Sequence, residues 1–266
     1  MKLLSHNERL PEQIKTSAKA IANQLVALQP TTDQTLWTES AYVFSALIDY
    51  SVQTQDHTHD ALVAREIASQ AGAGPPYFEP TTIQSNLTNA GQAQWALTAL
   101  QAAEVQFLSD AALPLSYAIL AEKVFEQLTT RWDQATCAGG LNSTISQTSA
   151  PTTKDVIAAA ELFQLGSRLA LSTGDGSYTA WANRIFDWIS GVGLLSSDWN
   201  VYANADPSSN CTEIDRTRWS ISAGEMLYGS ALMYNLVSVF LPTNKGRAKA
   251  DECACHRLTR SHGSRA

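Results

Sequence analysis

The chain has 266 residues, of which 44% are hydrophobic and 16% charged, and its formal net charge is −7. This composition suits a globular core with a weakly charged surface, and no apolar run reaches the roughly 18 residues that a transmembrane segment needs. Segment 244–266 holds six Lys or Arg and two acidic residues, which leaves −11 on the rest of the chain and argues against nucleic acid as a partner.

Apolar residues recur at three- and four-residue intervals over most of the chain, which predicts amphipathic helices. The expected helices span 11–29, 36–53, 57–71, 91–109, 114–132, 153–172, 178–189 and 219–239. Alternating residues at 137–145 are compatible with a small hairpin, but no βαβ alternation is present. A loose repeat relates 54–62 to 173–181, and repeated helical hairpins with short links favour a solenoid or a closed α/α toroid.

The stretch that enters the fourth helix has the strongest functional pattern. Asn89 is expected to cap this helix by accepting from the backbone N–H of Gln92, whose side chain would reach back in a capping box. The first turn of a helix stabilises negative charge through its free N–H groups. Two carboxylates about 5 Å apart there would make a retaining glycosidase site.

The cysteines fall into two groups. Cys137 and Cys211 lie in Gly-, Asn- and Ser-rich loops and form a disulfide candidate, although the sequence alone does not show that they are close. Cys253, Cys255, His256 and His262 fit no standard zinc spacing, so we expect no metal and no cofactor.

Sequons at Asn86, Asn142 and Asn210 support a glycoprotein only weakly, and residues 1–9 lack the apolar core of a signal peptide.

Residues 89–95, Asn-Ala-Gly-Gln-Ala-Gln-Trp, with Ala-Ala-Glu at 102–104, resemble a segment of glycoside hydrolase family seventy-six. This family contains endo-α-1,6-mannanases and related fungal cell-wall transglycosylases, and its usual string is Asn-Asp-Asp-Gln. Here Ala90 and Gly91 stand in place of the catalytic aspartate pair. The residues around the site therefore resemble those of the family, but the two carboxylates are missing.

The resemblance extends over roughly 11–235. It includes Trp-Thr-Glu at 37–39, Ala-Leu-Ile-Asp-Tyr at 46–50, the loop 132–141, Asp-Trp-Asn-Val-Tyr at 198–202 and the segment 211–220. It implies an all-α, (α/α)6-barrel (toroid) of helical hairpins over 11–242, incomplete at the C-terminus by about two hairpins. We expect residues 1–10 and the basic tail 243–266 to be disordered.

Family positions suggest seven substrate-binding residues, for which packing or capping is the alternative role: Trp37, Asn89, Gln92, Trp95, Lys154, Asp215 and Trp219. We expect Ala90 and Gly91 in the first helical turn, facing a cleft lined by Trp95 or Trp219. Candidate replacements for the lost acids are Asp49, Asp198, Asp206 and Asp215, although capping or solvated charge is favoured for each. Glu104 is expected to be a buried structural anchor, and Lys154 to be exposed unless it bonds sugar hydroxyls.

Three hypotheses about function stay open. The chain resembles a mannan endo-1,6-alpha-mannosidase that would act on cell-wall α-1,6-mannan by a retaining two-carboxylate mechanism, and the resemblance implies a secreted or cell-wall location. Because the aspartate pair is missing, the second hypothesis is a non-catalytic relative that binds mannan or a partner. The third is a truncated fragment without stable function. If the scaffold is otherwise intact, restoring both aspartates at Ala90 and Gly91 should recover some turnover.

Overall fold

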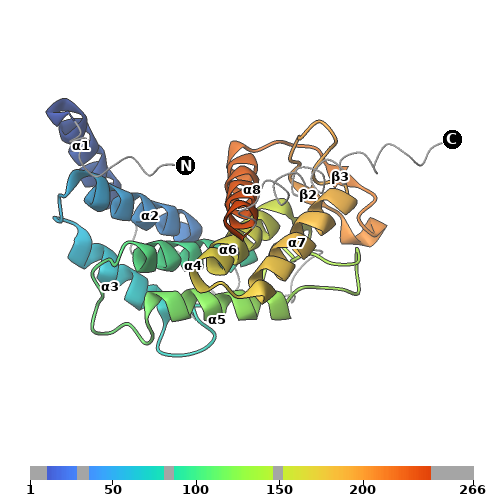
Figure 1. Ribbon diagram of the computed structural model, residues 1–266, viewed down its shortest axis with the longest axis horizontal. Coiled ribbons are helices and arrows are strands. Elements are labelled where there is room, and N and C mark those ends of the chain that lie inside the picture. Colours follow the sequence, from blue (N-terminus) through green and yellow to red (C-terminus); the bar gives the residue numbers. More distant parts are fainter. Residues whose placement is uncertain (1–10, 29–35, 81–86, 146–151, 241–266) are drawn as a thin grey trace.

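The computed structural model describes residues 11–28, 36–80, 87–145 and 152–240. The helices in these ranges are α1 (Glu12–Leu28), α2 (Trp37–Thr54), α3 (Asp60–Ala71), α4 (Asn89–Glu104), α5 (Tyr117–Thr130), α6 (Val156–Thr173), α7 (Gly176–Gly191) and α8 (Ser220–Phe240). Figure 1 shows them in chain order, and each corresponds to a helix expected from the sequence. The predictions for 1–10, for the tail 243–266 with its Cys and His residues, and for the Asn86 sequon lie outside the described residues.

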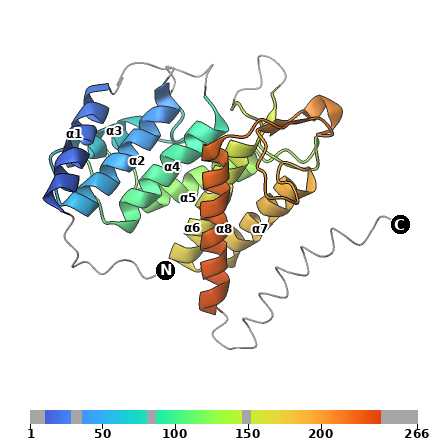
Figure 2. The same ribbon diagram turned by 90° about the horizontal axis from the view of Figure 1, so that it is seen from above.

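The even-numbered helices form an inner row. Helix α2 packs on α4, α4 on α6, and α6 on α8, while α1 and α3 pack on α2, α5 on α4 and α6, and α7 on α6. Figure 2 shows α1 and α2 at one end of this arrangement and α6, α7 and α8 at the other. The structure is therefore an open arc of helical hairpins with the architecture of an α/α toroid, as the sequence predicted.

The two central helices of the inner row are buried on almost every side. In α4, every residue from Asn89 to Leu100 is buried, and α6 is buried from Ala158 to Ala170. Both are rich in alanine, whose high helix propensity and small side chain let neighbouring helices approach from all directions. Gly229 of α8 serves the same purpose, because a Cβ there would lie 2.5 Å from the ring of Phe163.

Within the part of the chain that the structure describes, helix α8 packs along one flank. Its buried stripe includes Ser222, Met226 and Leu236, whereas Leu227, Tyr228 and Tyr234 are exposed on the other side. No described helix is both long and apolar enough to cross a membrane.

Short strands link the loops that precede the inner helices. Strands β1 (Lys154–Asp155), β2 (Asn204–Ala205) and β3 (Ile214–Asp215) form an antiparallel sheet in which Lys154 pairs with Ala205 and Ala205 with Ile214. Segment 137–145 forms no hairpin of its own. Instead, isolated bridges join Thr144 to Thr88 and Asn142 to Lys154, so this segment connects the loop before α4 to the sheet.

Candidate site at the start of the inner helices

The loops joined by these bridges gather at one end of the arc. The backbone N–H of Asn89 donates to Ser143, that of Ser143 to Thr153, and that of Val156 to Ala203, so the entries of α4 and α6 are tied together. The start of α2 lies against the start of α4, where the indole N–H of Trp95 donates to the carbonyl of Trp37 at 3.2 Å. The amino ends of inner helices, which favour negative charge, therefore meet here.

The first turn of α4 begins one residue earlier than predicted. Thr88 is the N-cap, and its side-chain oxygen accepts from the backbone N–H of Gly91 at 2.9 Å. The prediction that Asn89 caps the helix is wrong, because its amide nitrogen donates to the carbonyl of Asn142 at 2.7 Å. As predicted, Ala90 and Gly91 both lie in the first turn.

Gly91 is buried and is covered by side chains of α2. A Cβ built on Gly91 would lie 2.5 Å from Oγ1 of Thr38 and 2.5 Å from Cζ3 of Trp37. Trp37 itself is buried, and its indole N–H donates to Gln70 at 3.0 Å. Trp95 is fully buried, and its ring stacks on Phe78 with a centroid separation of 5.8 Å. Trp95 therefore takes the packing role that the sequence had left open for it, and its buried ring is not available to stack on a sugar.

Arg131, at the end of α5, organises the polar side of the turn. Its guanidinium donates to Oδ1 of Asn89 at 2.8 Å, to Oε1 of Glu79 at 2.9 Å, and to the side-chain oxygen of Gln92. Gln92 in turn donates to the carbonyl of Tyr77 at 2.7 Å. Burial lowers the pKa of Arg131, and the charge of Glu79 opposes this. Asn89 and Gln92 are thus buried members of a positioning network, which sequence reasoning missed because its centre, Arg131, lies 39 residues from Gln92.

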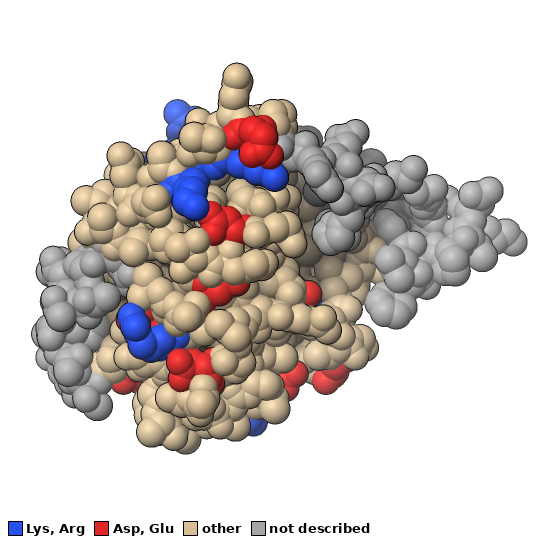
Figure 3. Space-filling model, turned by 90° about the vertical axis from the view of Figure 1, so that its left-hand side faces the viewer, with Lys and Arg blue, Asp and Glu red and all other residues tan. Residues whose placement is uncertain are grey.

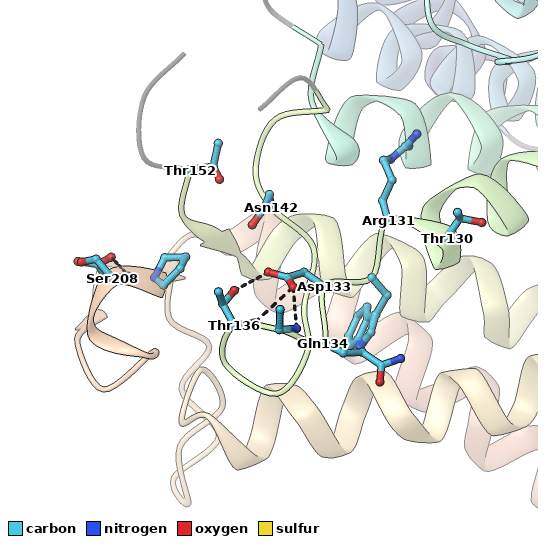
Figure 4. A pocket seen from close by; sticks show the side chains of 12 residues that line it. Thr130, Arg131, Asp133, Gln134, Thr136, Asn142, Thr152 and Ser208 are labelled. Atoms are coloured by element: carbon cyan, nitrogen blue, oxygen red, sulfur yellow. Dashed lines mark hydrogen bonds between the residues drawn. The ribbon is translucent and has the colours of Figure 1, made fainter. Parts of the chain in front are cut away.

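A hollow of about 750 Å³ lies beyond Arg131. Figure 4 shows polar side chains around it, from the loop after α5 (Asp133, Gln134 and Thr136), from Asn142 and Thr152, and from Ser208. Because Arg131 borders both places, the hollow adjoins the first turn of α4.

An ion pair supports one wall of this hollow. The ammonium of Lys154, which is fully buried and not exposed as the sequence suggested, donates to Oδ2 of Asp133 at 2.7 Å. Burial raises the pKa of Asp133, but hydrogen bonds from Lys154, Thr136 and the backbone of Ala135 outweigh this and hold it below its usual range. Lys154 therefore positions Asp133, and its own ammonium is not free to meet a sugar.

Several carboxylates that could replace the lost pair have other partners or lie elsewhere. The carboxylate of Asp49 accepts a hydrogen bond from Gln101 at 2.7 Å. Glu104 is exposed, whereas the sequence predicted that it would be buried. Its carboxylate pairs with the guanidinium of buried Arg168 at 2.6 Å. Glu104 lies at the far end of α4, about 20 Å along the helix from Ala90. Asp206 caps the short helix Pro207–Ser209, and Asp215 accepts from the backbone and hydroxyl of Thr217, which lower its pKa. Asp198 is exposed.

Two carboxyl groups near the inner row went unnoticed in the sequence. Asp155 caps α6 by accepting from Ile157 at 3.0 Å, and burial raises its pKa to about 6. Glu161 is fully buried and accepts from the hydroxyl of Tyr42 at 2.6 Å, and its burial raises its pKa well above the usual range. The pattern of an Asp directly before an apolar helix could have identified Asp155 as a cap.

Cys137 and Cys211 form a disulfide with a Cα–Cα distance of 5.4 Å. It joins the loop after α5 to the loop before α8, which leads to Trp219. Trp219 is 58% exposed and is free to contact a ligand.

Among the described residues, no group of three or more His, Cys, Asp or Glu is placed to hold a metal ion. On the face in Figure 3, the Lys and Arg of the described residues are scattered among acidic groups and form no extended basic patch.

Residues 13–241 match the family described as Glycosyl hydrolase family 76. The mannan endo-1,6-alpha-mannosidase DCW1 of Candida albicans is 35% identical over 202 residues, which cover 75% of this chain and 44% of that protein. The DCW1 protein of Saccharomyces cerevisiae is 30% identical over 206 residues, which cover 76% of this chain and 46% of that protein. The chain thus spans a little under half the length of these relatives.

Solved structures have the same fold. Dfg5 from Chaetomium thermophilum, determined in complex with glucosamine, superposes with a TM-score of 0.80 at 28% identity, covering 91% of this chain and 63% of that one. An α-1,6-mannanase of Salegentibacter, in complex with α-1,6-mannotriose, gives a TM-score of 0.66 at 15% identity, covering 86% and 67% of the two chains. That protein is described as an inactive variant in which two consecutive aspartates are replaced by asparagine.

Proposed function

This chain belongs to glycosyl hydrolase family 76, and from that premise we propose that it binds a chain of α-1,6-linked mannose without hydrolysing it. The observation that carries the proposal is the first turn of α4, which holds Ala90 and Gly91 and in which Trp37 covers Gly91. The motif resemblance aligns these two residues with the family's paired aspartates. A retaining mechanism needs one carboxylate to attack the anomeric carbon and another to protonate the leaving oxygen. Neither residue supplies a carboxyl group.

The partners and positions of most carboxylates considered as replacements argue against such a pair. Asp49 and Glu104 pair with Gln101 and Arg168, and Glu104 lies at the opposite end of α4. The carboxylates of Asp206 and Asp215 accept hydrogen bonds from the backbone N–H groups of Ser208 and Thr217, in the turns that follow them. Asp155 is at the correct end, but its side chain caps α6, and one carboxyl group cannot act as both nucleophile and acid in the same step.

Binding does not require the missing carboxylates. The Salegentibacter mannanase holds α-1,6-mannotriose in a variant that lacks two consecutive aspartates. In the present chain, the hollow beside Arg131 offers Asn142, Thr152 and Ser208 to sugar hydroxyls, and Trp219 offers an exposed ring. A concave polar surface suits the hydroxyl groups of a carbohydrate, and an exposed aromatic ring suits the C–H face of a sugar.

We also propose that the protein works outside the cytosol, at the cell wall. The disulfide between Cys137 and Cys211 favours an oxidising compartment, and the relatives named above are mannan-directed enzymes by their names.

The test uses the full chain and α-1,6-mannotetraose. Calorimetric titration should detect binding, and chromatography of a long incubation should detect no shorter oligosaccharide, while an active member of the family run in parallel cleaves the substrate. Cellotetraose serves as the control sugar and should bind more weakly. Release of shorter mannosides would refute the loss of hydrolysis, and absence of any binding would refute the mannan-binding role.

A further inference from the structure

The long connection between α7 and α8 holds a tryptophan in a costly conformation. Trp199 has φ +63°, in the left-handed region that bulky side chains rarely adopt, and its side chain is 60% exposed. Such a backbone conformation is strained for a bulky residue, and an exposed ring offsets little of this strain through burial. Glycine or asparagine would suit the turn better. Stability of the fold therefore does not account for a tryptophan here.

The turn that carries Trp199 is closed by several hydrogen bonds. Ser196 and Asn200 exchange backbone and side-chain bonds, with the N–H of Ser196 donating to the carbonyl of Asn200 at 3.0 Å and the N–H of Asn200 donating to Oγ of Ser196 at 3.0 Å. Beneath it, Leu195 pairs with Val201, which is buried. The indole is therefore presented on a fixed support, which lowers the entropy lost when a ligand binds.

A second exposed tryptophan is tied to the same turn. Oδ1 of Asn200 accepts from Nη1 of Arg218 at 2.9 Å, so the residues next to Trp199 and next to Trp219 are in direct contact. Close by in the chain, the guanidinium of Arg216 lies over the ring of Tyr202, 5.6 Å from its centroid. This surface combines exposed aromatic faces with amide and guanidinium groups, which can pack on the C–H face of a sugar and bond its hydroxyls.

We propose that Trp199 and Trp219, on either side of the Asn200–Arg218 hydrogen bond, form a platform that binds the mannose chain as it extends from the candidate site. This inference rests on the proposed mannan-binding function and assigns Trp199 a contact with the ligand.

The experiment compares α-1,6-mannohexaose binding by the full chain and by Trp199→Asn, a substitution that suits the left-handed backbone. The variant should fold with unchanged or higher stability and bind about fivefold to tenfold more weakly. Trp219→Ala should show a similar loss. Tyr228→Ala, which removes an exposed ring from α8, is the matched control and should bind as the wild type does.

The outcomes separate this inference from the function on which it rests. If the wild type binds mannohexaose and Trp199→Asn binds equally well, the platform is refuted and the proposed function stands. If only Trp219→Ala weakens binding, the platform is also refuted. If the wild type binds no mannohexaose, both proposals fall. Sedimentation of each protein tests self-association, and a change of oligomeric state in Trp199→Asn without a change in affinity would assign the surface to a second copy instead.

Discussion

The ring of Trp37 lies where a side chain at Gly91 would extend, so that an added Cβ would be 2.5 Å from Cζ3 of the indole. Thr38 approaches the same point from α2. The position that the resemblance aligns with a catalytic aspartate is therefore filled by packing against α2. A carboxylate at this position would therefore need side chains of α2 to move.

We first predict that Gly91→Ala destabilises the protein by about 1–2 kcal/mol. Overpacking costs about 1–3 kcal/mol, and the better helix propensity of alanine returns up to about 1 kcal/mol. The matched control is Gly176→Ala in the first turn of α7, where a Cβ meets nothing within 4 Å and stability should be unchanged or slightly higher. Urea denaturation of both variants measures the difference, and equal stabilities would show that Trp37 moves aside freely.

The same contact changes the expectation for restored aspartates. Ala90→Asp with Gly91→Asp should be less stable than the wild type and should show no turnover of α-1,6-mannan, because the second carboxylate displaces Trp37 and Thr38. Turnover by this double variant would contradict the prediction and would support the simpler view from the sequence, in which the scaffold only lacks its acids.

The next prediction concerns Arg131, which joins Glu79, Asn89 and Gln92. Arg131→Met should lower the free energy of unfolding by about 2–3 kcal/mol, since it leaves buried acceptors without their donor. Arg131→Lys keeps the charge but loses the planar fork, so its loss should be intermediate. The exposed Lys123–Glu126 pair is the control, and Lys123→Met should have no measurable effect. Equal behaviour of Arg131→Met and Lys123→Met would contradict the structural role of this network.

The disulfide gives a prediction about reduction. Cys137 and Cys211 are 74 residues apart, so the bond removes considerable freedom from the unfolded chain. Cys137→Ser with Cys211→Ser should lower stability by about 2–4 kcal/mol. Reductant should destabilise the wild type by a similar amount and leave the double variant unchanged. A wild type that is insensitive to reductant would show that the bond contributes nothing to stability.

Helical periodicity predicted the fold well because the apolar faces of outer helices such as α5 and α7 are set by local sequence. Details of the site depended on contacts distant in sequence. Nothing near Lys154 shows that its ammonium is buried against Asp133, and nothing near Gly91 shows that Trp37 covers it. The cap of α4 was misplaced by one residue because Thr88 and Asn89 are both good caps, and Arg131 decides between them by binding Asn89.

The last prediction is a pH dependence caused by Asp155. Its pKa rises from 3.8 to about 6 on folding because burial disfavours the charged form. A carboxyl group with a raised pKa stabilises the fold fully below about pH 4, and this contribution is lost as pH rises toward 6. Asp155→Asn keeps the capping oxygen and carries no charge, so it should match the wild type near pH 4 and exceed it above pH 6. Because the carboxyl group is still partly accessible to water, we expect a difference on the order of 1 kcal/mol. Urea denaturation of both proteins from pH 4 to pH 7 measures the gap, and a constant gap over this range would show that Asp155 does not titrate there.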